Sequence, residues 1–290
     1  MPVYIIGLAF VYFNEDIMQD SIKLDFKCVV VLVAAFIVAN LLMASYAVFH
    51  LFVLKDEVQY SMGYTMVSFV LSMGLPILAF DFGIVRPKIG QPLHIPFKLL
   101  PTTDYLLTIP MMFGMGFMAE VVTSWIPTDS GVLGEWYQAF NGVFKSMAYD
   151  KVGMLITVVI FAPIFEELIF RGIILKGLLN NGIAPKTAIV LSSVVFGIVH
   201  GNPWQFLGAV MLGLVLGLAY YKTKSILLTM ILHALNNLVA CLMLFYVGKD
   251  SFIEALGWNS WIIFFIGAVL FGVFYYLFMH RKVHHLKGKI

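Results

Sequence analysis

Charged residues are scarce in this chain. Only 12% of its 290 residues are Asp, Glu, Lys or Arg, whereas 61% are hydrophobic, and the mean hydropathy is +0.94. This composition is far from that of a soluble domain. The net charge is only +2, and no basic tract with interleaved aromatic residues is present. We therefore expect a membrane protein with the lipid bilayer as a partner and no nucleic-acid partner.

Cysteine and the familiar hydrolase motifs are also missing or nearly so. The two cysteines, Cys28 and Cys241, have no zinc or redox spacing and no disulfide framework, so we expect inert packing residues. The zincin pattern His-Glu-x-x-His is absent, and no serine occupies a nucleophile-elbow setting. Any hydrolytic chemistry must therefore use other groups.

Long apolar runs predict an all-α, polytopic membrane protein with about eight transmembrane helices and one integral membrane domain over residues 1–290. A helix needs ~20 apolar residues to cross a bilayer. By this measure the candidate spans are 29–54, 60–80, 104–126, 152–172, 186–201, 204–221, 225–247 and 259–280. The fifth is short, and we expect it to be tilted or partly re-entrant. Residues 2–13 are apolar but too few to span, and no basic region precedes them, so we expect an interfacial or docked segment rather than a signal peptide.

Lys and Arg residues orient these spans. With both termini on one side, thirteen Lys and Arg residues lie on that side against four on the other, Lys55, Lys145, Lys151 and Lys249. The positive-inside rule then places both termini in the cytoplasm, and in the cell membrane if the source is prokaryotic. The longest cytoplasmic loop would be 81–103, and the 127–151 loop would lie outside.

The most informative polar cluster is Glu166, Glu167 and Arg171, which lies inside an apolar run. Each charge at bilayer depth costs roughly 2.5–3.5 kcal/mol. Glu167 and Arg171 have the i,i+4 spacing of an ion pair, whereas successive residues turn by about 100°, so Glu166 should face elsewhere, toward a cavity. Snorkelling to the interface is the alternative, but Glu166 lies about 21 Å from the helix end at Asn180.

Two further pairs have i,i+4 spacing in apolar runs: Phe196 with His200, and His233 with Asn237. His200 is predicted at the same depth as Glu166, although a packing histidine at a span boundary is the alternative. His233 and Asn237 could donate hydrogen bonds to a developing oxyanion, or could link helices. Helix geometry does not decide between Asn237 and its neighbour Asn236.

A carboxylate and a histidine at equal depth can hold a water molecule, with the glutamate as general base. Attack on a peptide carbonyl would give an oxyanion, stabilised by His233 and Asn237, without a covalent intermediate. We expect no cofactor and no dedicated metal site, although a set of Glu166, His200 and His233 could bind zinc.

In this order, Glu-Glu-x-x-x-Arg (166–171), Phe-x-x-x-His (196–200) and His-x-x-x-Asn (233–237) resemble the three motifs of type II CAAX prenyl endopeptidases, within the CPBP or Abi intramembrane proteases. The resemblance covers about 150–240, in a predicted core of 151–245, whereas the helices of 28–150 match nothing specific. Lys224 stands where the common form has Gly.

The resemblance implies an eight-helix bundle whose catalytic cavity opens to the cytoplasm. It also implies that Glu166 and His200 activate the water, that His233 and Asn237 form the oxyanion site, and that Glu167 and Arg171 support them. The family has been labelled metalloprotease, but a metal-independent glutamate mechanism is preferred.

The resulting prediction is an intramembrane endopeptidase that cleaves a peptide bond near the terminus of a membrane-associated or lipidated peptide or protein. The first alternative is a non-catalytic scaffold or bacteriocin-immunity protein on the same fold, which would be expected to lose motif residues. A transporter is the second alternative, but it would favour inverted repeats, and the polar residues here lie only in the second half.

Overall fold

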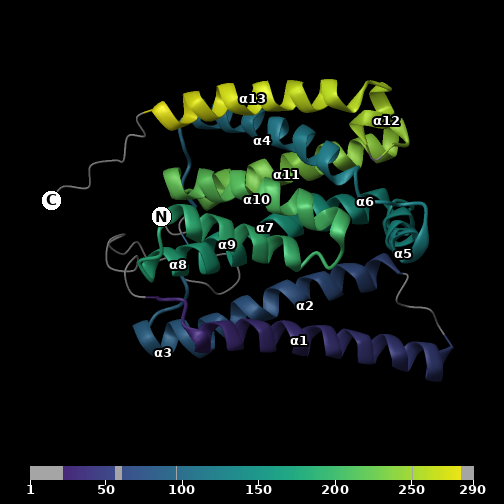
Figure 1. The fold of residues 1–290 in the computed structure, drawn as a ribbon. Helices are drawn as coiled ribbons and strands as arrows, with labels where there is room; N and C mark the ends of the chain where they lie inside the picture. The colour runs from purple at the N-terminus through teal and green to yellow at the C-terminus, as the bar shows by residue number, and fades with distance from the viewer. Residues whose placement is uncertain (1–21, 56–60, 96, 250, 282–290) are drawn as a thin grey trace.

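The described chain is built of helices, with no β-strand among the residues placed. The computed structural model describes residues 22–55, 61–95, 97–249 and 251–281. The apolar segment 2–13 lies outside these residues. In chain order (Figure 1) the helices are α1 (Phe26–Phe49), α2 (Met62–Phe80), α3 (Arg86–Ile89), α4 (Thr102–Thr123), α5 (Gly131–Met147), α6 (Lys151–Met154), α7 (Ala162–Glu167), α8 (Lys176–Asn180), α9 (Pro185–Ile198), α10 (Pro203–Thr223), α11 (Ile226–Leu242), α12 (Phe252–Leu256) and α13 (Ser260–His280).

Several α-helical pieces continue into one another through π-helical segments. These segments are η1 (His50–Leu54), η3 (Asp81–Val85), η4 (Leu155–Phe161), η5 (Leu168–Leu175) and η6 (Met243–Val247). As a result, α6, η4, α7, η5 and α8 form one continuous helix of 30 residues, Lys151–Asn180. The expected extension of the fourth span to Asn180 is therefore confirmed.

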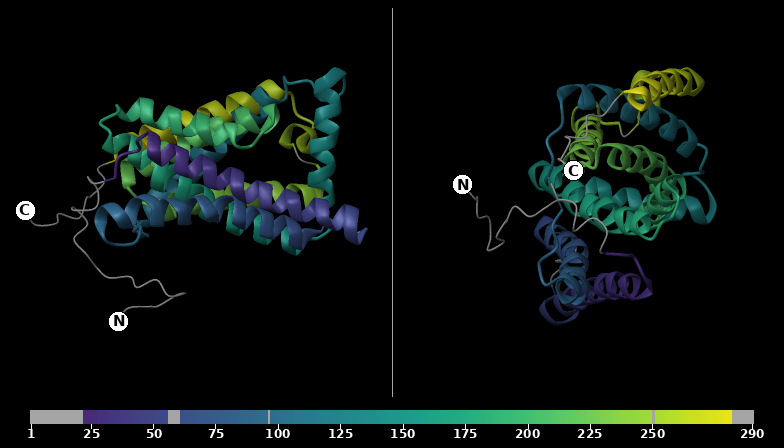
Figure 2. Two further views of the ribbon diagram at one scale, coloured as in Figure 1. Left: turned by 90° about the horizontal axis from the view of Figure 1, so that it is seen from below. Right: turned by 90° about the vertical axis from the view of Figure 1, so that its left-hand side faces the viewer.

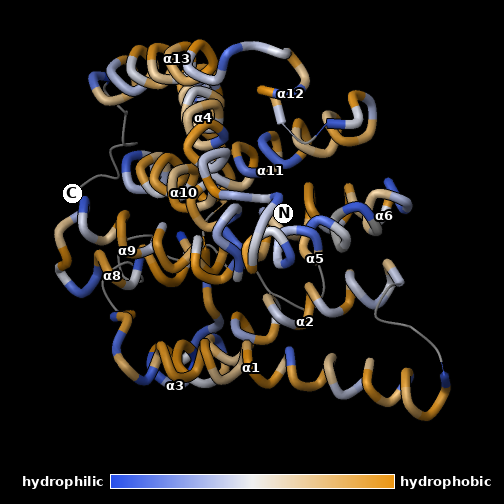
Figure 3. Tube along the Cα trace, turned by 45° about the vertical axis from the view of Figure 1, so that its right-hand side comes forward, coloured by the Kyte–Doolittle hydropathy of each residue, from blue (hydrophilic) through white to orange (hydrophobic). Residues whose placement is uncertain are grey.

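Seven described helices are long and apolar enough to cross a membrane, which confirms the all-α polytopic class. They are Phe26–Leu54, Met62–Ile89, Thr102–Thr123, Lys151–Asn180, Pro203–Thr223, Ile226–Val247 and Ser260–His280. The fifth expected span, 186–201, which was expected to be short, corresponds to α9, which has only 14 residues. Apolar residues run along the full length of the outer helices α1 and α13 (Figure 3), as expected for surfaces that face lipid.

The helices lie side by side in a bundle, and α1 begins at the same end at which α13 stops (Figure 1). α1 and α2 form one edge and α4 and α13 the other, with α7 and α9–α11 between them. At the far end, α5 runs across the bundle rather than along it (Figure 2). Its Trp136 and Tyr137 rings lie 5.9 and 5.1 Å from the ring of Trp204 in α10.

Both regions expected to be loops contain helix. The outer region 127–151 contains α5, whose amphipathic pattern places apolar residues on one face. A sequence search for continuous apolar runs does not detect such a pattern. The region 81–103 begins with η3 and α3, and the carboxylate of Asp81 accepts hydrogen bonds from Arg86 Nε (2.9 Å) and from the backbone of Leu93 (2.6 Å). These bonds hold the segment after α3 against the bundle.

Glycines allow α9 and α10 to approach each other closely. A Cβ on Gly197 would lie 2.9 Å from the Phe206 carbonyl, and one on Gly213 would lie 3.2 Å from the Ser193 Cα, so both are at the α9–α10 contact. Small residues at both positions therefore let the two helices pack closely. Gly201 instead has a positive φ of 69° and forms the turn before α10.

At the end where α13 stops, ionic contacts join the helices. Arg281 Nη1 donates to Asp104 Oδ1 at 2.6 Å, and the Lys222 ammonium donates to the carbonyls of Phe278 and Met279 at the C-terminus of α13. A cation at this position also complements the helix dipole. Nearby, Lys224 adopts φ 55°, a conformation that favours Gly, and burial together with the Lys176 charge lowers its pKa.

Replacing Gly114 with Ala should separate α4 from α13. The added Cβ would lie 2.5 Å from the Phe271 nitrogen and 2.8 Å from the Gly267 carbonyl oxygen, both backbone atoms. Overpacking of this kind costs about 1–3 kcal/mol, so the thermal midpoint in detergent should fall. The control is Gly272→Ala on α13, where nothing lies within 4 Å of the new Cβ. Equal midpoints for the two variants would contradict the close contact.

Candidate active site

Glu167 and Arg171 form the predicted ion pair. Arg171 Nη1 donates to Glu167 Oε1 at 2.7 Å, and both side chains are essentially inaccessible. Arg171 Nη2 also donates to the Gly213 carbonyl at 3.2 Å, which ties this helix to α10. A buried guanidinium with one carboxylate and one carbonyl is held in a single orientation.

His233 of α11 lies between the two glutamates. Its Nδ1 is 3.0 Å from Glu167 Oε1, and its Nε2 is 3.7 Å from Glu166 Oε2. Both ring nitrogens therefore face a carboxylate, and the ring itself is buried. Two consecutive acidic residues thus approach one imidazole from two sides.

Glu166 was expected to point away from Glu167, toward His200. The structure brings it near the same histidine that Glu167 contacts, and His200 also interacts electrostatically with it. Glu166 and Glu167 are consecutive residues of α7, so their side chains leave the helix about 100° apart. Both can reach His233 because the two nitrogens of its ring point in different directions.

One oxygen of Glu166 has no hydrogen-bond partner among the described residues. Glu166 Oε2 is buried, and the 3.7 Å to His233 Nε2 is longer than a hydrogen bond. A buried carboxylate oxygen without a partner is costly. A site that leaves it so is arranged for a further polar group.

His200 follows α9 in the turn that leads to α10. Its Nδ1 donates to the Phe196 carbonyl at 2.7 Å, given that the carbonyl can only accept. The Asn202 side chain donates to the His200 carbonyl at 3.0 Å and also caps α10 by accepting from the Gln205 backbone at 2.8 Å. The first bond leaves Nε2 as the nitrogen available for chemistry.

The Phe196 ring joins the two histidines and the ion pair. It meets His200 edge to face at 4.9 Å and His233 at 5.7 Å between ring centroids. The Arg171 guanidinium lies 4.7 Å from its centroid, and Phe170 packs against it at 5.0 Å. One buried aromatic ring therefore contacts three of the predicted polar residues, Arg171, His200 and His233.

Asn237 is fixed by the helix that carries the glutamates. Its Nδ2 donates to the Val158 carbonyl at 2.8 Å, and its Oδ1 accepts from Asn236 Nδ2 at 3.3 Å. The two asparagines are therefore hydrogen-bonded to each other, and the structure does not assign the oxyanion role to one of them alone. One N–H of Asn237 is left for another acceptor.

Sequence reasoning missed the partners that are backbone atoms. The Gly213 carbonyl accepts from Arg171, and the Val158 carbonyl accepts from Asn237. Every residue has a backbone carbonyl, so a sequence does not show which one will act as a partner. The missing side chain of Gly213 allows a different contact, the close approach of Ser193 in α9.

The donor types would suit a metal ion, but their placement does not. Two imidazoles and a carboxylate are ligands that zinc prefers. Among the residues that the structure describes, no three His, Cys, Asp or Glu side chains lie in a metal-binding arrangement. We therefore derive no step through a metal.

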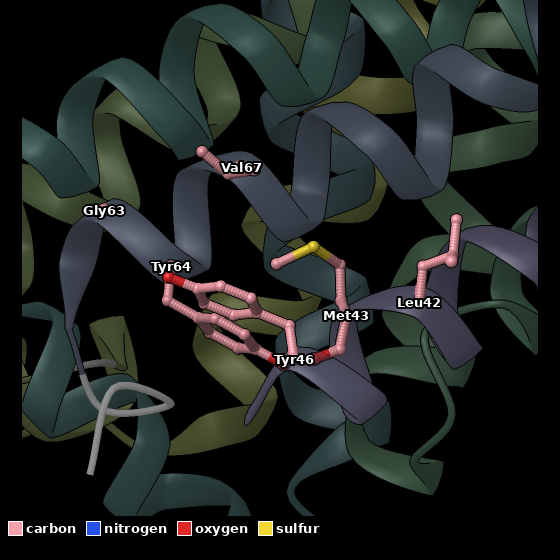
Figure 4. Close-up of a pocket in the computed structure, with 6 residues that line it drawn as sticks. All are labelled: Leu42, Met43, Tyr46, Gly63, Tyr64 and Val67. Carbon is pink, nitrogen blue, oxygen red and sulfur yellow. Dashed lines mark hydrogen bonds between the residues drawn. The ribbon is translucent and has the colours of Figure 1, made fainter. Parts of the chain in front are cut away.

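A separate groove lies elsewhere in the bundle. It has a volume of about 370 Å³ and lies between α1 and α2 (Figure 4), lined by Leu42, Met43, Tyr46, Gly63, Tyr64 and Val67. The Tyr46 and Tyr64 rings stack at 6.4 Å. None of the predicted site residues lines this groove, so it does not mark the site.

The site thus places two glutamates, an arginine and two histidines inside an integral membrane helical bundle. Residues 148–239 match the family model described as Type II CAAX prenyl endopeptidase Rce1-like, which confirms the resemblance seen in the three motifs. That match supports a CAAX-type intramembrane protease fold. It contains all six predicted site residues but less than half of the chain.

Two curated proteins of Lactococcus lactis subsp. lactis (strain IL1403) are also similar. UPF0177 protein YxdF is 34% identical over 80 residues, which cover 27% of this chain and 43% of that protein. UPF0177 protein YajF is 36% identical over 91 residues, 31% of this chain and 42% of that protein. The chain thus matches less than half the length of either relative. No solved structure matches the chain.

Replacing Arg171 with Met should destabilise the protein strongly. Glu167 would keep a buried charge without its cation, a change that costs about 3–5 kcal/mol. The control is Lys249→Met, which removes the pair with Glu254, in which the two side chains are 49% and 57% exposed. Thermal unfolding in detergent should show a clearly larger fall for Arg171→Met, and the reverse order would contradict the proposed importance of the pair.

Proposed function

We propose that the protein is an intramembrane endopeptidase of the CAAX type that hydrolyses a peptide bond by a glutamate-activated water. The observation that carries this proposal is the buried Glu166 Oε2, which lacks a hydrogen bond and lies 3.7 Å from His233 Nε2. A water molecule could bond to both atoms at about 2.8 Å. The family match over the same residues supports the protease class.

In the proposed reaction, Glu166 takes a proton from the water with the help of His200. The water oxygen then bonds to the peptide carbonyl carbon, and the carbonyl oxygen becomes an oxyanion. His233 and Asn237 donate hydrogen bonds to this oxyanion, an interaction that strengthens as charge develops. When the C–N bond breaks, the proton passes to the leaving amine.

The substrate we propose is a membrane-associated or lipidated peptide or protein, cleaved near its terminus. The glutamates lie in the middle of a 30-residue apolar helix, Lys151–Asn180. Only a chain that enters the bilayer, or is anchored at its surface, can bring a peptide bond to that depth. A lipid anchor raises the local concentration of such a chain at the membrane.

Glu166→Gln should abolish cleavage while preserving the fold, because the amide has the shape of the carboxylate but cannot act as a base. Loss of a general base lowers turnover by about 100- to 10,000-fold. Membrane peptides from cells that express the wild type or Glu166→Gln can be compared by mass spectrometry. Uncleaved precursors should accumulate in the variant, and new termini should appear only with the wild type.

Glu254→Gln is the control, since Glu254 is exposed and its ion-pair partner among the described residues is Lys249, at the far end. It should process peptides like the wild type. If folded Glu166→Gln yields the same termini as the wild type, the hydrolase proposal is wrong. A non-catalytic scaffold on this fold would be expected to behave that way.

We also propose that the end of the bundle with α3 and α8 faces the cytoplasm, following the Lys and Arg bias. A cysteine at Lys88 should then react with a membrane-impermeant maleimide only after the cells are permeabilised. A cysteine at Lys249 should react in intact cells. The native Cys28 and Cys241 are 1% and 2% exposed, so the background should be low. The opposite labelling pattern would show that this end of the bundle faces the outside and would contradict the proposed topology.

A further inference from the structure

One oxygen of Glu167 contacts two side chains that belong to different helical segments. Its Oε1 lies 2.7 Å from Arg171 Nη1 and 3.0 Å from His233 Nδ1. We propose that Glu167 is a positioning residue that fixes which ring nitrogen of His233 carries the proton and aims the other at Glu166. The proposal deepens the proposed function and, in its mechanistic part, rests on it.

The hydrogen-bond partners place a proton on Nδ1 of His233 in both the neutral and the protonated ring. A carboxylate paired with a guanidinium is ionised, and an ionised carboxylate can only accept hydrogen bonds. The His233 nitrogen that faces it must therefore be the donor, so Nδ1 carries the hydrogen. A neutral imidazole has one N–H, which leaves Nε2 as the acceptor that faces Glu166.

The ring cannot easily turn over to escape this assignment. Turning the ring by 180° about Cβ–Cγ would place the carbon Cδ2, in place of Nδ1, against the Glu167 oxygen. The Phe196 ring packs against His233 at 5.7 Å and is itself held by Arg171 and Phe170. Arg171 in turn is fixed at both of its terminal nitrogens, by Glu167 and by the Gly213 carbonyl.

This arrangement defines how His233 can stabilise an oxyanion. With Nδ1–H committed to Glu167, Nε2 can donate only after it has taken up a proton. The proton that Glu166 removes from water can pass from Glu166 Oε2 to His233 Nε2, which lies 3.7 Å away. The protonated ring then donates Nε2–H to the oxyanion, and the same proton is available to the leaving amine when the C–N bond breaks.

Two double variants separate positioning from simple charge pairing. Glu167→Gln/Arg171→Met and Glu167→Leu/Arg171→Met both remove the buried ion pair with side chains of similar volume, a change that proteins often tolerate. Only the first keeps an oxygen that can accept from His233 Nδ1. Turnover is measured in proteoliposomes with a quenched-fluorescent peptide that carries a farnesylated cysteine near its C-terminus.

The Gln/Met variant should keep kcat within about tenfold of the wild type, whereas kcat of the Leu/Met variant should fall about 100-fold with little change in KM, as for loss of an orienting partner. Gly114→Ala, destabilised away from the site, should not lower kcat. If the two double variants have equal kcat, the oxygen of residue 167 does not position His233 and the proposal is wrong.

A direct measurement on the wild type keeps the proposal testable even if both variants fail to fold or the peptide is not cleaved. Solid-state NMR of ¹⁵N-histidine protein, with His233 assigned by its loss in His233→Gln, reports which ring nitrogen is protonated. We expect a hydrogen-bonded Nδ1–H. A bare Nδ1 with a protonated Nε2 would overturn the proposal, whereas absent proteolysis with the expected spectrum would overturn only the proposed function.

Discussion

The central constraint on this structure is that charged side chains are buried at a depth where the bilayer is hydrocarbon. Two carboxylates and a guanidinium lie within six residues of a helix that is otherwise apolar, and each must find a partner inside the bundle, since lipid offers none. Arg171 takes Glu167 and the Gly213 carbonyl, and His233 joins both glutamates. The surrounding helices are held where these contacts require them. Gly197 and Gly213 let α9 and α10 close on the cluster, and α11 supplies the histidine.

The contacts also separate support from chemistry. Glu167 and Arg171 bond to each other, and Arg171 also bonds to the Gly213 carbonyl, although Glu167 Oε2 and Arg171 Nε have no hydrogen-bond partner among the described residues. Glu166 makes no hydrogen bond through its buried Oε2, and each histidine has its Nδ1 engaged. Glu166 Oε2 differs from Glu167 Oε2 in facing the second nitrogen of His233, at 3.7 Å, and the proposed reaction assigns proton transfer to this oxygen.

Much of this was predictable from the sequence. The apolar runs predicted the helices, and the i,i+4 spacing predicted the Glu167–Arg171 pair. The order of the three motifs indicated the family resemblance over about 150–240, and the family match over 148–239 confirms it. Amphipathic α5 and the α3 turn were missed because neither forms a continuous apolar run. A helical wheel separates Glu166 from Glu167, but it does not show that one imidazole from α11 meets both carboxylates. The roles of the Gly213 and Val158 carbonyls could not be predicted, because only the packed backbone brings them into reach.

The central claim is that water, activated at Glu166, attacks the peptide bond directly. Rapid-quench mass spectrometry during turnover in ¹⁸O-water tests it most directly. The account predicts one ¹⁸O in the new C-terminal carboxylate, no peptide covalently attached to the protein at any time, and neither product nor label with Glu166→Gln. A peptide–protein adduct that forms and decays during the first turnover would contradict it.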